Sequence, residues 1–315
     1  GNLAVTSTSG PGLALKSEGI GLAVMAELPL VVIDVQRGGP STGLPTKTEQ
    51  TDLMQALYGR NGESPLAVVA PASPTDCFTM AFEACRIAVE HSTPVILLSD
   101  AFIGNGSSAW RVPESSEYPE IKAPELKLAD GQRFCPTMRD EETLARPWPV
   151  AGTEGLQHRL GGLEKDIRTG AISTDPVNHE RMVEIRRRKI ENIAKDIPAL
   201  EVHCVVDADT LLLGWGGTYG HLLTAATELC ESGRPVAMAQ LRYISPLPAN
   251  TAEVLRRYRK VIVAELNSGM LADYLQAKFP DVEIHRINKV QGQPFMVSEL
   301  VAAVDRINSL NTVAQ

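Results

Sequence analysis

Short apolar runs alternate with segments of helical periodicity along this chain, and this alternation constrains the fold more than any other feature. The runs carry almost no polar residues, as parallel strands do when helices cover both faces of their sheet. In the first hundred residues we expect strands at 3–5, 30–35, 66–69 and 94–100, and helices at 13–25, 49–58 and 76–90. This part is therefore predicted to be an α/β domain with a doubly wound parallel sheet.

The same alternation returns in the second part of the chain. Strands are expected at 210–214, 236–241, 261–265 and 282–285, and helices at 219–231, 251–258, 271–279 and 297–307. Between the two parts, a stretch rich in Pro, Gly, Ser and charge precedes a charged helix expected at 179–197. Irregular segments of that length usually cover a site or an interface. We therefore predict a first domain at 1–198, with a long irregular insertion at about 101–178, and a smaller α/β domain at 199–315.

Charge and hydrophobicity indicate a soluble cytoplasmic protein. The 315 residues carry a net charge of −8, which argues against a nucleic-acid partner because phosphate-binding surfaces need a basic excess. The best candidate for a membrane span, 19–35, is interrupted by Glu27, Pro29 and Asp34, so no membrane association is expected. The first residues, GNLAVTSTSG, are typical of the middle of a domain, and we expect an upstream part that is missing here.

The segment TSTSGPG, residues 6–12, joins an expected strand to an expected helix. Its glycines let the backbone come close to a ligand, and the free N–H groups at a helix start favour an anion. An ordinary turn with Ser9 as the helix N-cap explains the same residues equally well. Thr8, Ser9 and Gly10 are the candidates for contact with a ligand.

A cation stands where the second expected strand ends, because Arg37 follows the run VVIDVQ and opens the loop GGPSTG. Its planar guanidinium fits a carboxylate with two parallel hydrogen bonds. The carboxyl ends of parallel strands are also where α/β sheets bind ligands, and Ser41 and Thr42 would add neutral donors. The alternative is an ion pair between Arg37 and Asp34 or Asp52. We favour a small anionic substrate.

Other kinds of site lack their signature in this sequence. The five cysteines lie far apart and form no C-x-x-C pair, so no metal ligands are predicted. There is no G-x-S-x-G motif, which leaves a serine hydrolase without its nucleophile elbow. The glycines of GWGGTYG, residues 214–220, lie one residue off the dinucleotide spacing. A tight turn with close helix–strand packing explains them better than NAD binding.

Several blocks of sequence, taken together, resemble one enzyme family. They are TSTSGPG, VVIDVQRGGPSTGLPTKTEQTDL, PVILLSD, RPWPVAGTEGLQHRLGGLEKD, GWGGTYG, LRYISPLP and NKVQGQPF. In this order, and over nearly the whole chain, they resemble the alpha subunit of the 2-oxoacid:ferredoxin oxidoreductases, specifically that of the 2-oxoglutarate enzymes. The resemblance implies a thiamine-pyrimidine-type domain followed by a transketolase C-terminal-like α/β domain.

The resemblance also implies a reaction that depends on thiamine diphosphate. Such enzymes convert 2-oxoglutarate, coenzyme A and oxidised ferredoxin into succinyl-CoA, CO2 and reduced ferredoxin, and some members run the reaction in reverse to fix CO2. The G-D-G…N motif and the cluster cysteines of the family are absent from this chain. Mg2+ and a [4Fe–4S] cluster are therefore expected mainly on a beta subunit. The expected assembly is a dimer of alpha–beta units in which residues 112–176 wrap the partner.

The roles of individual residues follow from the same resemblance. Arg37 occupies the position of the family's arginine that binds the substrate carboxylate, with Ser41 and Thr42 beside it. Residues 8–10 are expected to lie near the cofactor. The glutamate that activates the aminopyrimidine lies upstream in the family and is not found here, so no catalytic residue is identifiable in this chain.

Three alternatives stay open. Pyruvate or a broad range of 2-oxoacids could replace 2-oxoglutarate, because no residue is assigned to the distal carboxylate. The chain could instead be a non-catalytic assembly subunit of the same complex. A nicotinamide dehydrogenase is the third alternative, weakened by the glycine spacing described above.

Overall fold

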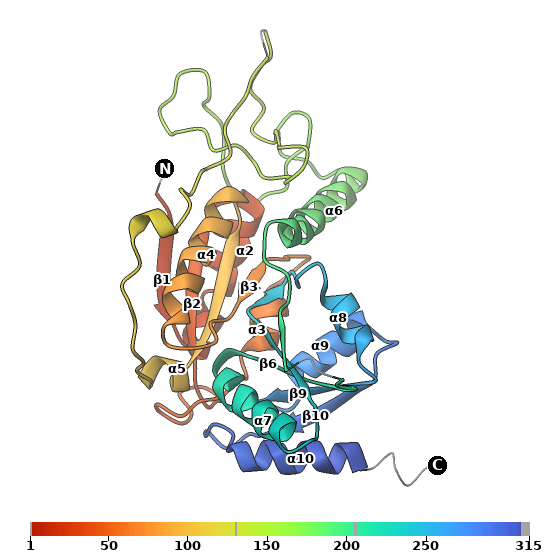
Figure 1. Cartoon of the computed structure of the whole chain (residues 1–315). Coiled ribbons are helices and arrows are strands. Elements are labelled where there is room, and N and C mark those ends of the chain that lie inside the picture. The colour runs from red at the N-terminus through yellow and green to blue at the C-terminus, as the bar shows by residue number, and fades with distance from the viewer. Residues whose placement is uncertain (1, 130, 205–206, 310–315) are drawn as a thin grey trace.

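Two five-stranded sheets form the framework of the protein (Figure 1). The structure is a computed structural model, and it describes residues 2–129, 131–204 and 207–309. The first sheet has the order β1 (Ala4–Thr8), β2 (Leu30–Gln36), β4 (Pro94–Asp100), β3 (Ala67–Val69) and β8 (Tyr243–Ser245). Its first four strands are parallel and β8 is antiparallel to β3. This sheet therefore takes its last strand from the second part of the chain.

Helices cover both faces of the first sheet. They are α1 (Gly10–Leu15), α2 (Ser17–Ala26), α3 (Leu53–Tyr58), α4 (Asp76–Glu90) and, at the end of β4, the short α5 (Ala101–Asn105). Val31 of β2 packs in one core with Met80 of α4, whereas Val32 packs in another with Leu13 of α1 and Leu53 of α3. The strand thus alternates between two buried faces, which explains its almost continuous apolar sequence.

The second sheet repeats this construction. Its order is β10 (Ile284–Asn288), β9 (Lys260–Glu265), β6 (Thr210–Trp215), β7 (Ala237–Leu241) and β5 (Val202–His203), all parallel except β5. The helices α7 (Tyr219–Glu231) and α10 (Val297–Ser309) cover one face, and α8 (Thr251–Arg257) and α9 (Met270–Lys278) cover the other. Leu271 of α9 belongs to the same core as Leu53 of α3. The two parts are therefore packed together through apolar side chains.

The predicted α/β fold class is confirmed, with local differences. The helix expected at 13–25 is two helices that meet at Lys16, and the strands β5 and β8 were not predicted. The charged helix α6 (Pro176–Asn192) begins three residues before the predicted start, because Asp175 caps it and Pro176 fits the first helical turn. A short 3-10 turn, η2 (Ile193–Lys195), completes it. The boundary at 198/199 stays a prediction.

The segment between α5 and α6 is irregular except for the 3-10 turn η1 (Ser115–Glu117) and one bridge between Lys165 and Ile172, within the residues described. Most of it forms long loops beyond the starts of the first sheet's strands (Figure 1). Arg146 donates to the carbonyl of Ala26, and its own carbonyl accepts from Ser92. Both partners shortly precede strands, so this segment covers the amino edge of the sheet. The start of the segment, residues 106–110, instead lies near the other end of the sheet, where it lines a pocket with Val35 and Ser99.

A buried ionic cluster fixes that segment to the domain. Glu27, at the end of α2, pairs with Arg139 of the irregular segment and with Lys189 of α6 at 2.8 Å. Burial alone would raise the pKa of Glu27, but the charges of Lys189 and Arg139 outweigh it and lower this pKa to about 2. The cluster therefore joins three elements through one buried carboxylate.

No helix among the described residues has the length and apolar character needed to span a membrane.

Candidate functional site

The carboxyl edges of the two sheets meet at Asp100, the last residue of β4. Its Oδ2 accepts a hydrogen bond from the backbone N–H of Gly217, just after β6, at 2.8 Å. Its Oδ1 accepts from the hydroxyl of Thr48 at 3.1 Å. Burial raises the pKa of Asp100, and these hydrogen bonds act against that rise. A fully buried carboxyl group thus connects the ends of two strands from different sheets.

Gln50 makes the second connection between the sheets. Its side-chain Nε2 donates to the carbonyl of Trp215 and its Oε1 accepts from the N–H of Leu266, both at 2.8 Å. Asn267 donates in turn to the backbone carbonyl of Gln50 at 2.8 Å. All three partners follow or end strands of the second sheet. The loop that begins at Arg37 is therefore hydrogen-bonded to the second sheet through Gln50, which lies near the C-terminal end of the loop.

Arg37 stands at this shared edge, as the sequence predicts. It follows β2 directly, and the preceding residue, Gln36, donates through Nε2 to the carbonyl of Ser99 at 3.1 Å. The Arg37 side chain is half-buried and its Nε has no hydrogen-bond partner in the structure. Within the described residues, no acid lies within ion-pair distance of its guanidinium, so the alternative pairing with Asp34 or Asp52 is wrong for this structure.

The loop after Arg37 closes on itself. The N–H of Gly38 donates to the carbonyl of Lys47 at 2.9 Å, and the N–H of Leu44 donates to the carbonyl of Gly38 at 2.8 Å. Gly43 has φ +45°, and a Cβ added there would lie 1.8 Å from the carbonyl oxygen of Gly38. Only glycine fits this closure without rearrangement.

Ser41 and Thr42 lie at the exposed tip of this loop. Ser41 adopts φ +55°, in the left-handed region that few non-glycine residues occupy. The structure thus places both hydroxyl residues on the same loop as Arg37, as the sequence indicates. Their exposure leaves them available to a ligand or a partner.

The turn after β1 reaches the same edge, because β1 pairs with β2 in parallel and Thr8 stands opposite Asp34. Ser9 occupies the N-cap position of α1, but its side chain makes no capping bond. The predicted N-cap position of Ser9 is therefore confirmed, whereas its hydroxyl group is not used for capping. A Cβ on Gly10 would lie 2.6 Å from Oδ1 of Asp52. The carboxyl group of Asp52 therefore occupies the space next to Gly10 that a side chain would fill.

The sequence analysis considered Asp34 and Asp52 only as partners of Arg37 and did not predict that the two acids act on each other. Burial raises the pKa of Asp34 to about 8, with the neighbouring charge of Asp52 as the next cause. Burial also raises the pKa of Asp52, and Glu49 adds to that rise. The signal in the sequence is a single acid inside an otherwise apolar strand, which parallel strands rarely contain.

The GWGGTYG segment serves the junction between the sheets. A Cβ on Gly217 would lie 2.6 Å from the carboxylate of Asp100, and a Cβ on Gly216 would lie 2.7 Å from Nε2 of Gln50. These glycines therefore admit side chains of the first domain rather than a dinucleotide. This supports the interpretation as a tight turn with close packing. The space beside Gly216 and Gly217 that a dinucleotide phosphate would need is occupied by the side chains of Gln50 and Asp100.

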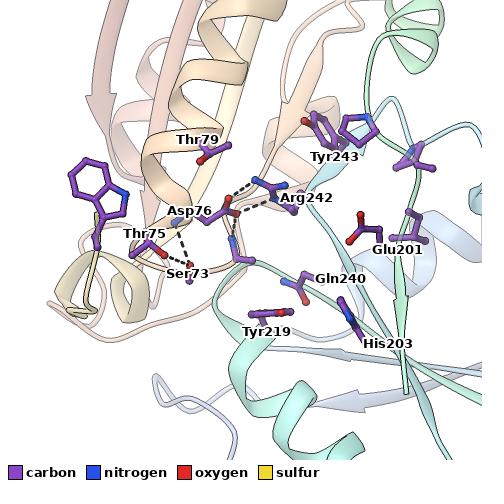
Figure 2. A pocket seen from close by; sticks show the side chains of 16 residues that line it. Ser73, Thr75, Asp76, Thr79, Glu201, His203, Tyr219, Gln240, Arg242 and Tyr243 are labelled. Carbon is purple, nitrogen blue, oxygen red and sulfur yellow. Dashed lines mark hydrogen bonds and ion pairs between the residues drawn. The ribbon is translucent and has the colours of Figure 1, made fainter. Parts of the chain in front are cut away.

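A separate cavity of about 620 Å³ lies between the two parts of the chain (Figure 2). The side chains of Asp76 and Arg242 point toward each other at its side and form an ion pair, with the Nε–Oδ2 contact at 3.0 Å. Glu201, just before β5, and His203, in β5, line the other side. The volume is ordinary for a small-molecule pocket, but its lining contains none of the residues predicted to bind substrate.

The described residues offer no ready metal site. They contain no group of three or more His, Cys, Asp or Glu side chains arranged to hold a metal ion. The five cysteines are free thiols.

Comparison with known proteins gives a consistent family. A family described as "Pyruvate flavodoxin/ferredoxin oxidoreductase, thiamine diP-bdg" matches residues 1–173. The 2-oxoglutarate oxidoreductase subunit KorA of Mycobacterium tuberculosis is 56% identical over 301 residues, which are 95% of this chain and 45% of the relative. The 2-oxoglutarate synthase subunit KorA of Archaeoglobus fulgidus is 32% identical over 86% of this chain and 70% of the relative.

Solved structures agree with these sequence matches. The 2-oxoglutarate:ferredoxin oxidoreductase from Magnetococcus marinus, with 2-oxoglutarate, coenzyme A and succinyl-CoA bound, superposes with a TM-score of 0.89 at 34% identity. The match covers 97% of this chain and 53% of that one. A split-gene transketolase, at 13% identity and a TM-score of 0.52, shares the fold alone. The chain thus spans about half the length of the M. tuberculosis relative and of the M. marinus chain.

Proposed function

This chain belongs to the pyruvate flavodoxin/ferredoxin oxidoreductase family, and from that premise we propose that it is the alpha subunit of a 2-oxoglutarate:ferredoxin oxidoreductase. The reaction would convert 2-oxoglutarate, coenzyme A and oxidised ferredoxin into succinyl-CoA, CO2 and reduced ferredoxin. The names of the M. tuberculosis and A. fulgidus relatives and the ligands of the M. marinus structure support this substrate.

The observation that carries the proposal is the buried Nε of Arg37, which has no hydrogen-bond partner, on a guanidinium that forms no ion pair within the described residues. A buried N–H donor without a partner is unusual in native proteins, and a bound anion would accept a hydrogen bond from this Nε. A 2-oxoacid carboxylate would accept two parallel hydrogen bonds from the guanidinium fork. Ser41 and Thr42, on the same loop, would donate hydroxyl hydrogen bonds to the same substrate.

Thiamine diphosphate, when bound, supplies the carbanion chemistry, and the protein supplies placement and electrostatics. In this chain the residues that would face the cofactor are Thr8, Ser9 and Gly10. The uncapped hydroxyl of Ser9 fits this role, because it is not used by helix α1. Arg37 would hold the substrate carboxylate in a fixed orientation at the same sheet edge, and the loop that closes through Gly38 and Lys47 would keep it there.

The partners are proposed on chemical grounds as well as on family membership. The sequence lacks the G-D-G…N motif and the described residues contain no group of three or more His, Cys, Asp or Glu side chains arranged to hold a metal, so we assign Mg2+ and the [4Fe–4S] cluster to a beta subunit that completes the active site. Ferredoxin would accept the electrons, in the cytoplasm. The assembly would be a dimer of alpha–beta units, with residues 112–176 against the partner.

The proposal is tested by steady-state kinetics of the complete complex. Viologen reduction that depends on coenzyme A is measured with 2-oxoglutarate and with pyruvate. A higher kcat/KM for 2-oxoglutarate is the expected result. A preference for pyruvate would move the substrate to the alternative 2-oxoacid while keeping the reaction. A complex that holds thiamine diphosphate and its cluster but oxidises no 2-oxoacid would overturn the enzymatic role and favour a non-catalytic assembly subunit.

A further inference from the structure

Asp34 is a carboxyl group in a place where parallel strands carry apolar side chains. It is 0% exposed and shares a face of β2 with Val32, which packs in the core below α1 and α3. Neither of its oxygens has a hydrogen-bond donor among the described residues. Buried polar atoms are nearly always bonded in native proteins, so this carboxyl group needs a partner.

The partner is a second carboxyl group, that of Asp52. Asp52 occupies the N-cap position of α3, and its backbone N–H donates to Oε1 of Gln36 at 3.2 Å. Its carboxylate also packs on Gly10, where a Cβ would lie only 2.6 Å away. The carboxyl group of Asp34 is close enough to bond with that of Asp52. The two acids therefore join β2, the turn after β1 and the end of the Arg37 loop.

Two ionised carboxylates cannot bond to each other, because both are acceptors only. A single proton converts one of them into a donor and satisfies both. The charged groups that act on the pair are all acids: Asp52 acts on Asp34, and Glu49 acts on Asp52. No cation contributes to either group among the residues described. The electrostatics of the site thus favour keeping a proton, and the raised pKa of Asp34 agrees with the geometry.

We propose that Asp34 and Asp52 share one proton and act as a positioning pair that holds the Gly10 turn against the start of the Arg37 loop. The inference rests on the proposed role of Arg37 in substrate binding. Asp34 lies three residues before Arg37, and Asp52 ends the loop that Arg37 begins. When the proton leaves to solvent, two buried charges repel each other across this contact, and the loop loses the support that places Arg37.

The shared proton makes the free energy of unfolding depend on pH, and the direction of this dependence follows from the raised pKa. An acid with a raised pKa is protonated in the folded state and ionised in the unfolded state between the two pKa values, which are about 8 and 3.8. The folded state therefore binds more protons in that window, and stability falls as pH rises from about 4 to 8. Asp34→Asn keeps a neutral group with an N–H donor and removes this dependence.

The first test measures the proton itself in the complete protein. The infrared C=O band of a protonated carboxylic acid should be present at pH 7, decrease through pH 8 and be absent from Asp34→Asn at both pH values. The unfolding equilibrium constant of the wild type, relative to that of Asp34→Asn, should increase up to about tenfold per pH unit between pH 5 and 8. Asp281→Asn, at an exposed surface pair, is the matched control and should follow the wild type.

The second test measures positioning. We expect the KM for the 2-oxoacid in the wild-type complex to rise at least fivefold from pH 7 to pH 9, with a smaller change in kcat. The same KM ratio should be close to one in Asp34→Asn. Asp52→Asn is the reciprocal variant, and it keeps the test available if Asp34→Asn does not fold. A KM ratio that is equal in wild type and variants would overturn the positioning role.

The outcomes separate this inference from the proposed function. If Arg37 does not bind substrate, the infrared band and the stability slope persist while KM loses its pH dependence. If the acids do not share a proton, the band is missing and the slope is flat, whatever Arg37 does. Stabilisation of the wild type by Mg2+ at pH 9 that is lost in Asp34→Asn would also overturn the inference, because the pair would then hold a cation instead of a proton.

Discussion

The carboxylate of Asp100, at the end of β4, accepts a hydrogen bond from the backbone N–H of Gly217, which follows β6. One contact thus joins the carboxyl edges of two sheets built from different halves of the chain. The edge that carries Arg37 and the turn of residues 8–10 is therefore held at a fixed position relative to the second domain. This arrangement gives the second domain a direct part in shaping the proposed site.

Asp100→Asn should loosen this junction. The Oδ1 of Asp100 accepts from Thr48, Phe102 and Ile103, and Oδ2 accepts from Gly217. The side-chain amide of the variant keeps one acceptor oxygen, but its NH2 group replaces the other oxygen and faces a hydrogen-bond donor. One buried donor is therefore left unpaired, which lowers the free energy of unfolding by about 1–3 kcal/mol. We expect faster hydrogen exchange at the Gly217 amide and a lower Tm. Unchanged exchange at that amide would show that the contact does not hold the sheets together.

Acid should release the irregular segment through Glu27. The pKa of Glu27 is about 2 in the folded state, against an ordinary value of 4.5 for a glutamate, so its contribution is present above about pH 4.5 and is lost as pH falls toward 2. The shift corresponds to about 3 kcal/mol. Glu27→Gln should reproduce this loss at pH 7 by leaving Arg139 and Lys189 without their buried partner.

Limited proteolysis at pH 7 measures this effect. Cleavage within residues 119–175 should be much faster in Glu27→Gln than in the wild type. Glu120→Gln is the matched control, because Glu120 forms only an exposed pair with Lys122 at 3.6 Å. Equal cleavage rates in all three proteins would contradict the role of the cluster.

Gly43→Ala should weaken substrate binding without touching Arg37. The added Cβ would lie 1.8 Å from the carbonyl oxygen of Gly38, so the loop has to open and Ser41 and Thr42 have to move. We expect KM for the 2-oxoacid to rise about tenfold or more, equivalent to at least about 1.4 kcal/mol, with a smaller effect on kcat. Gly19→Ala is the control, because a Cβ there meets nothing within 4 Å. An unchanged KM in Gly43→Ala would remove the loop from the binding site.

Much of the fold follows from patterns in the sequence. The helix α4 and the strand β4 have the bounds expected from an amphipathic segment and a continuous apolar run. The place of Arg37 at the carboxyl edge follows from the same pattern, because the end of a buried parallel strand fixes where the next residue lies. These features depend on local periodicity alone.

Other features depend on contacts between distant residues. The strand β8 has only three residues and joins the first sheet from the second half of the chain, and no local pattern specifies that pairing. The pairing of Asp34 with Asp52 also brings together the two ends of a long loop, and no motif in the sequence predicts that these ends meet. Helix α1 ends at Leu15, and the N–H of the next residue, Lys16, bonds to carbonyls of the preceding turn, although the apolar periodicity of the sequence continues. Tertiary structure decides each of these.

The most direct test of the account is the effect of Arg37→Met and Arg37→Lys on kcat/KM for 2-oxoglutarate in the complete complex. Loss of a guanidinium that pairs with a desolvated carboxylate should lower kcat/KM by about 30-fold to several thousand-fold, or about 2–5 kcal/mol. Lysine should restore only part of it, because the charge returns without the planar fork. Arg111→Met, at an exposed pair with Glu117, should match the wild type. Wild-type kcat/KM in Arg37→Met would contradict the proposed binding of the substrate carboxylate.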